Sequence, residues 1–141
     1  MTRHELGVLP DWPPGTVAVL ATGAGAPHAI PVSTAVRSGP RTIALALALR
    51  RESLARLRED ARCSLTILAA GDMAFTAHGT ATIVEEPMAA SDRVAAVRIE
   101  VESIQDHGQD RFEIDAGVRW HWTDSEAEQR DAELRAALAG L

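Results

Sequence analysis

Two adjacent arginines, Arg50 and Arg51, have the residue type and the position to bind a phosphate group. They end a short apolar run and directly precede a predicted helix, whose first turn contains Ser53. Backbone N–H groups at a helix N-terminus, a serine hydroxyl and two guanidinium groups together suit a phosphate. The alternative is that both arginines are solvated charges that pair with Glu52 or Glu59. The sequence leaves both interpretations open.

The absence of lysine limits the chemistry that the chain can perform. Lysine and arginine together number 14, and all 14 are arginine. A Schiff-base lysine and the lysine of a P-loop are therefore excluded. Any anion that is bound by a side-chain cation must be bound by arginine or by protonated histidine. Tyrosine is also absent, so no phenol can act as a general acid.

A pair of glycines, Gly23 and Gly25, lies in the stretch LATGAGAPHAIPVS of residues 20–33. A dinucleotide-binding fingerprint needs a third glycine where His28 stands, and a helix that begins there. The residues that follow have the pattern of a strand instead. The pair therefore favours a hairpin turn between the first two strands, where glycine adopts positive φ without steric cost.

The other residues with reactive or planar side chains fit structural roles as well as functional ones. Cys63 is the only cysteine and lies mid-strand, which predicts a small core residue and excludes an internal disulfide. His78 and His121 fit exposed strand positions or ligands. Trp120 and Trp122 fit core or interface positions, or a flat contact with a conjugated ring. No catalytic residue and no metal-ligand set is identified by spacing.

Composition places the chain among soluble single-domain proteins. Its 141 residues form one predicted domain, with 46% apolar and 24% charged residues. The net charge of -6 argues against a nucleic-acid partner, which would call for a basic face. The longest apolar runs are too short to span a bilayer. Because the segment MTRHELGVLPDWPP has no apolar signal core, we expect a cytoplasmic protein without a membrane partner.

Alternating and continuous apolar patterns predict seven strands. They cover residues 16–22, 29–37, 41–49, 62–69, 73–84 with Gly79 as a candidate bulge, 94–104 and 112–122. The third strand is apolar throughout, so we expect it to be central in the sheet. The seventh has the cleanest alternation, which predicts a half-buried antiparallel strand.

Two amphipathic helices complete the pattern. The first covers residues 51–60, with Ser53 or a neighbour as its cap. The second begins at a capping box formed by Ser125 and Glu128, and places Leu134 and Leu138 on its apolar face. Short turns between successive strands favour an antiparallel sheet. The predicted fold is therefore mainly β: an antiparallel split β-barrel of six to seven strands, with a short helix after the third strand and a C-terminal helix.

Four pieces of the sequence resemble the pyridoxamine 5′-phosphate oxidase-like family of flavin-binding split β-barrels. They are VAVLAT at 17–22, GAPHAIPVS at 25–33, LREDARCSL at 57–65 and FTAHGTATIV at 75–84. Each piece is degenerate, and their order and spacing carry the resemblance, which spans about residues 15–105.

The resemblance implies a homodimer with FMN, or in some branches F420 or haem, in a groove between the subunits. The flavin would lie against the second strand, with its phosphate near the end of the third strand and the start of the following helix. Ser33 and Thr34 would offer hydrogen bonds to the ring edge, and Trp120 or Trp122 would cover the ring. The implied cofactor-binding residues are Pro31, Val32, Ser33, Thr34, Arg50, Arg51, Ser53 and Trp122.

The chain departs from the family pattern at the implied phosphate site. Ser53 stands where the family often carries a phosphate-binding lysine, and an apolar residue near Leu47 replaces a common hydroxyl. Arg50 and Arg51 are placed to compensate, and the alternative is an altered flavin site. The chain also lacks the C-terminal arginine and histidine motif of true pyridoxamine phosphate oxidases, so that substrate is not expected.

The function predicted from this resemblance is a flavin-dependent oxidoreductase that acts on a small-molecule substrate, with the ring performing hydride or electron transfer. One alternative is a non-catalytic split barrel that stores, carries or senses a flavin, F420 or haem. Another is a dimeric structural barrel that binds none of them.

Overall fold

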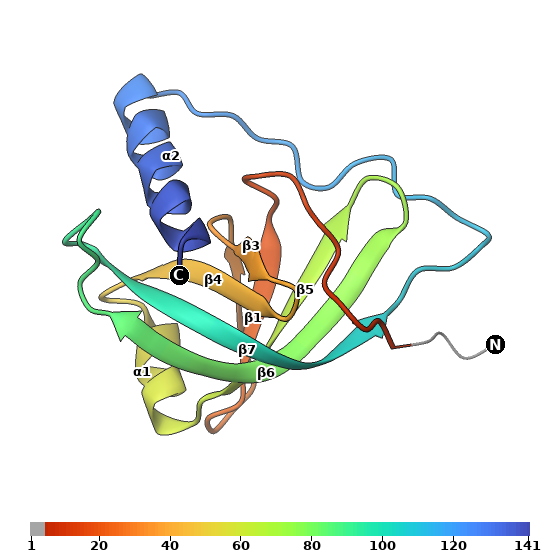
Figure 1. Cartoon of the computed structure of the whole chain (residues 1–141), viewed down its shortest axis with the longest axis horizontal. Coiled ribbons are helices and arrows are strands. Elements are labelled where there is room, and N and C mark those ends of the chain that lie inside the picture. The colour runs from red at the N-terminus through yellow and green to blue at the C-terminus, as the bar shows by residue number, and fades with distance from the viewer. Residues whose placement is uncertain (1–4) are drawn as a thin grey trace.

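The strands of the protein form one curved antiparallel sheet, as the computed structural model of residues 5–141 shows (Figure 1). Its seven strands follow the order β2-β1-β5-β6-β7-β4-β3. Their bounds are β1 Ala18–Thr22, β2 His28–Val32, β3 Val36–Gly39, β4 Thr42–Ala48, β5 Arg62–Ala69, β6 Met73–Glu85 and β7 Val94–Asp106. The edge strands β2 and β3 do not pair, so the sheet is not closed. The predicted mainly β, split-barrel fold is confirmed.

The centre of the sheet is the long pair β6 and β7, whose ladder shifts register between His78 and Gly79. The irregularity thus lies where the sequence indicated, but the extra residue is Glu102 of β7, because His78 pairs with Ser103 and Gly79 with Val101. A Cβ atom on Gly79 would lie 2.2 Å from the carbonyl oxygen of Glu100. The two strands approach so closely here that only glycine fits.

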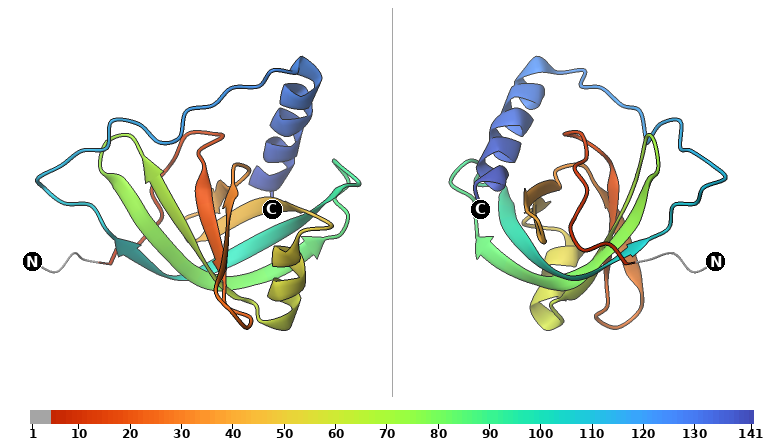
Figure 2. Two further views of the ribbon diagram at one scale, coloured as in Figure 1. Left: turned by 180° about the vertical axis from the view of Figure 1, so that it is seen from behind. Right: turned by 45° about the vertical axis from the view of Figure 1, so that its right-hand side comes forward.

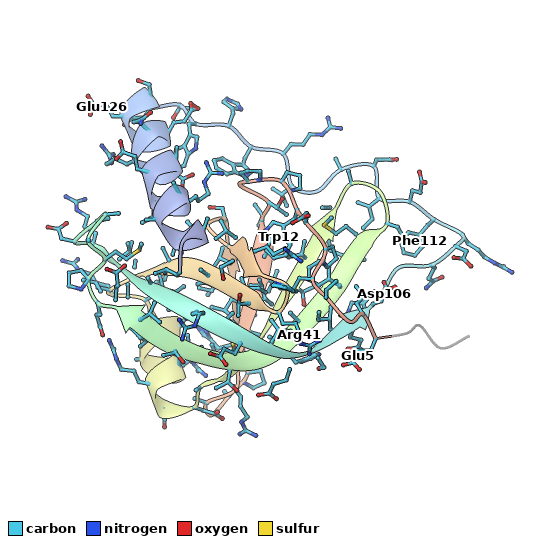
Figure 3. The ribbon with its side chains drawn as sticks, in the orientation of Figure 1. Glu5, Trp12, Arg41, Asp106, Phe112 and Glu126 are labelled. Carbon is cyan, nitrogen blue, oxygen red and sulfur yellow. The ribbon has the colours of Figure 1, made fainter. Side chains whose placement is uncertain are left out.

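The core fills the concave side of this sheet. The alternation of β5 turns Cys63, Leu65 and Ile67 inward. Burial raises the pKa of the Cys63 thiol to about 12, which keeps it neutral at physiological pH and suits the predicted role of a small core residue. Trp12 closes the core: its ring centroid lies 5.9 Å from that of Phe75, and its Nε1 donates to the carbonyl of Ala35 at 2.9 Å (Figure 3).

The predicted single strand over residues 29–37 is wrong, because this segment crosses between the two edges of the sheet. Its first part, β2, pairs with β1, and its last part, β3, pairs with β4. At the crossing, the Thr34 hydroxyl accepts from the Ala46 amide at 3.0 Å and donates to the Ala46 carbonyl at 3.2 Å. The side chain thus satisfies backbone groups that a strand would otherwise pair. As a consequence, the first helix, α1 (Glu52–Glu59), follows the fourth strand and not the third.

The predicted strand over residues 112–122 is also wrong. These residues belong to an extended connection from β7 to the C-terminal helix (Figure 2), and Ile114 pairs only with Gly71. Their alternating side chains have no neighbouring strand to face, so Phe112 and Val118 remain 42% and 66% exposed. Figure 3 shows Phe112 at the outer bend of this connection, away from the sheet.

The apolar composition of β4 predicted a central strand. In the structure, β4 is instead second from the edge of the sheet. It is buried on both faces because the C-terminal helix α2 (Ser125–Ala139) covers its outer side. Leu138 of α2 packs there with Ala44 and Ala46, while Ile43 and Leu45 face the main core.

The cap of α2 lies one residue before the predicted capping box. Asp124 is the N-cap, and its carboxylate accepts from the amides of Glu126 and Ala127 at 2.9 and 3.4 Å. Ser125 is therefore the first helical residue. Of the helices in residues 5–141, none is long and apolar enough to cross a membrane.

Candidate functional site

A hollow of about 180 Å³ lies where β2 ends and β4 leads into α1. It is lined by residues 30–34, residues 46–48 and Arg51. The fold thus brings together two segments that the sequence separates, because β2 leaves the sheet at the crossing beside β4. Five of the eight predicted cofactor-binding residues, Pro31, Val32, Ser33, Thr34 and Arg51, line this one hollow.

The side chains of the β2 end differ in what they can offer a ligand. Pro31 is exposed and Val32 is buried. The Thr34 hydroxyl is held by Ala46, so it shapes the crossing. Ser33 is half-buried and makes no side-chain hydrogen bond with the rest of residues 5–141. Ser33 is therefore the hydroxyl at this end of the hollow that is open to a ligand.

The other end of the hollow is the N-terminus of α1. Arg51 is the N-cap residue, and its side chain does not accept a hydrogen bond from the first-turn amides. These N–H groups lack acceptors within the helix. Arg50 and Arg51 are exposed, and neither forms an ion pair with another residue of the described chain. Arg51 lines the hollow, whereas Arg50 lies beside it in the preceding turn.

Ser53 lies beneath this first turn. Its side chain is fully buried, and its hydroxyl has no hydrogen-bond partner in the part of the chain that the structure describes. Ser53 is one of the predicted cofactor-binding residues, and it does not line the hollow. A positively charged side chain and a helix end without a side-chain cap thus lie together at the hollow, and this combination suits an anion.

Comparison with known proteins identifies the family of the chain. A family model described as pyridoxamine 5′-phosphate oxidase matches residues 12–123. The chain belongs to the pyridoxamine 5′-phosphate oxidase family. No curated protein matches its sequence.

Solved structures share the fold of this family member. A conserved hypothetical protein from Mycobacterium tuberculosis superposes with a TM-score of 0.52 at 25% identity, covering 65% of this chain and 78% of the other. An F420 reductase gives a TM-score of 0.56 at 9% identity, covering 66% and 91%. A FAD-binding protein from Mesorhizobium loti gives 0.51 at 12% identity, covering 63% and 81%.

Trp122 lies in a different part of this family member. It lines a hollow of about 640 Å³ together with Trp120, Gly15 and Arg135. The two indole rings meet edge to face with centroids 5.2 Å apart, and the Trp120 Nε1 donates to the Gly15 carbonyl at 2.8 Å. Within one chain, Trp122 and Arg51 therefore belong to separate hollows.

Sequence reasoning missed a charged cluster beside the site. Arg56 donates to the Oε2 of Glu52 at 2.7 Å and to the carbonyls of Ala24 and Ala26. The spacing of Glu52 and Arg56 predicts their pairing on a helix. Their contact with the β1–β2 loop depends on a fold that brings together residues about thirty positions apart, which no local pattern reveals.

Across residues 5–141, no group of three or more histidine, cysteine, aspartate or glutamate side chains is arranged to hold a metal ion.

Proposed function

We propose that this chain is a flavin-dependent oxidoreductase that binds FMN at the hollow between β2, β4 and α1. One observation carries the proposal: Arg51 and the end of β2 line a single hollow at a helix N-terminus with no side-chain cap. Membership of the family supports it, as do the structural neighbours named as a FAD-binding protein and an F420 reductase. The latter name makes F420 the second candidate cofactor.

The residues present fit the phosphate end of such a cofactor. Arg51, with Arg50 beside it, would neutralise the phosphate, and the first-turn amides of α1 would donate to it. At about 180 Å³ the hollow is smaller than the roughly 300–1,000 Å³ of sites that enclose a whole ligand. The ring would therefore extend past Ser33 along the exposed side of Pro31. When bound, the flavin supplies hydride or electron transfer, and this chain supplies binding and orientation.

The phosphate assignment predicts a selective loss of affinity. Replacing both Arg50 and Arg51 with alanine should weaken FMN binding about tenfold to a hundredfold, since hydrogen bonds to a charged group contribute about 1.5–3 kcal/mol. Riboflavin has no phosphate, so its affinity should not change. Quenching of flavin fluorescence measures both affinities, and the exposed Arg111→Ala is the control.

Two outcomes would count against these assignments. If the double variant binds FMN as tightly as the native chain, the phosphate does not lie at Arg51. If the native chain takes up neither FMN nor F420, the oxidoreductase proposal fails. Turnover of a reduced nicotinamide with an electron acceptor separates an enzyme from a carrier of the same cofactor.

We also propose that the chain acts as a homodimer, as the family resemblance implies. Val19, Leu68 and Val118 are 43%, 53% and 66% exposed and line one apolar hollow on the outer face of β1 and β5.

Sedimentation of the native protein should give a mass near twice 15.1 kDa. Leu68→Glu should shift the protein towards monomer, because it places a charge in this apolar face. Val8→Glu is the control, since Val8 is 56% exposed and lines neither this hollow nor the tryptophan hollow. A native protein of 15.1 kDa in solution would contradict the proposal.

A further inference from the structure

The proposed phosphate site contains a carboxylate that opposes it. Glu52 is the first residue of α1 and directly follows Arg51. A carboxylate in the first turn of a helix is attracted by the same helix dipole that attracts a phosphate. It also repels a nearby phosphate by ordinary charge repulsion. An anion site at this helix end therefore needs the charge of Glu52 to be compensated.

Two groups hold this carboxylate on one side of the helix. The Arg56 Nε lies 2.7 Å from the Glu52 Oε2, and the His28 Nε2 lies 3.4 Å from the same oxygen. The Arg56 side chain is only 17% exposed, whereas that of Glu52 is 62% exposed, so the guanidinium is more shielded from water than the carboxylate. The hydrogen bond and charge of Arg56, with a smaller contribution from His28, lower the pKa of Glu52. The carboxylate thus stays ionised, and the guanidinium of Arg56 balances its charge.

The same guanidinium also fixes the chain that leads into β2. Its Nη1 donates to the carbonyl of Ala24 and, at 2.8 Å, to that of Ala26. These carbonyls belong to the β1–β2 loop, and β2 begins at His28. Arg56 therefore connects α1, which forms one end of the hollow, to the loop before the strand that forms the other.

We infer that Arg56 is a positioning residue for anion binding at the N-terminus of α1: it neutralises Glu52, so that this carboxylate does not repel an anion bound there. This inference rests on the proposed function for the identity of the anion as the phosphate of FMN. Arg56 acts through Glu52, whereas Arg51 lines the hollow itself.

Charge compensation predicts a specific pattern across a double-mutant cycle. Arg56→Gln leaves the Glu52 charge unbalanced, so FMN affinity should fall about tenfold while riboflavin affinity stays within twofold. Glu52→Gln combined with Arg56→Gln should recover most of the lost FMN affinity, because the repelling charge is gone. Arg130→Gln is the matched control: Arg130 forms the same type of pair with Glu126, 3.9 Å apart, on α2.

The measurement is fluorescence titration of the full-length chain with FMN and riboflavin. In parallel, inorganic phosphate is titrated at constant ionic strength and followed by the NMR shifts of the Glu52 and Ser53 amides. Equal losses of FMN and riboflavin affinity in Arg56→Gln would show a merely structural role and overturn the inference. Unchanged FMN affinity, or no recovery in the double variant, would also overturn it.

The phosphate titration separates this inference from the proposed function. If the native chain binds inorganic phosphate in an Arg56-dependent way but takes up no flavin, the proposed function fails and the inference stands. If inorganic phosphate does not shift the two amides of the native chain, the inference is overturned, whatever the flavin result.

Discussion

Gly79→Ala is expected to cost at least about 3 kcal/mol of unfolding free energy, at the upper end of the range for overpacked cores. The added Cβ would lie 2.2 Å from the Glu100 carbonyl oxygen and 2.9 Å from the Ile99 Cγ2. The first of these atoms is backbone in the longest strand pair of the sheet, so it cannot move without disturbing the β6–β7 ladder. Because small domains have a total stability of roughly 5–15 kcal/mol, much of the protein should be unfolded at moderate urea concentrations.

Urea denaturation followed by circular dichroism measures this loss. Gly7→Ala is the matched control, because no heavy atom lies within 4 Å of a Cβ at that position. Its stability should stay within about 0.5 kcal/mol of the native chain. If Gly79→Ala were equally neutral, the close approach of β6 and β7 at the bulge would be wrong.

The second large effect is expected from truncating the aromatic core. Phe75 is 1% exposed and packs against Trp12 with the ring planes tilted by 45°. Phe75→Ala should cost about 3–5 kcal/mol, from lost burial and from the cavity that remains. Phe75→Leu, which keeps most of the volume, should cost less than about 1.5 kcal/mol.

Chemical denaturation again gives the free energy, and in a Trp120→Phe, Trp122→Phe background the tryptophan fluorescence reports on Trp12, the remaining indole. Phe75→Ala should shift that fluorescence, because removing the ring opens the contact surface of the indole. A loss below about 1 kcal/mol for Phe75→Ala would mean that this ring does not fill the core as the structure places it.

Local patterns predicted the elements whose neighbours follow directly in the chain. The bounds predicted for β5 agree with the structure, and α1 lies within its predicted range. Both follow from side-chain periodicity, which an individual segment expresses by itself. Gly79 was a bulge candidate because a glycine inside a strand pattern often marks one, and the register of β6 and β7 does shift beside it, with the extra residue on β7.

Apart from the cap of α2, the errors concern partners that lie far away in the sequence. Residues 112–122 alternate as cleanly as a strand, yet only Ile114 finds a backbone partner, at Gly71. The apolar run of β4 reflects cover by α2 and not a central place in the sheet. Periodicity reports which faces of a segment are apolar, and it does not report what covers them.

The same distinction between local pattern and distant contacts applies to the candidate site. The order of residue types by itself determined that Arg50 and Arg51 stand before a helix in a chain without lysine, which favours an anion at that helix end. Only the tertiary structure decided that the end of β2 lies beside Arg51, that Trp122 lines another hollow, and that Arg56 balances Glu52. The physical reason is that a helix end and its charges are local, whereas a hollow exists only where separate segments are packed side by side.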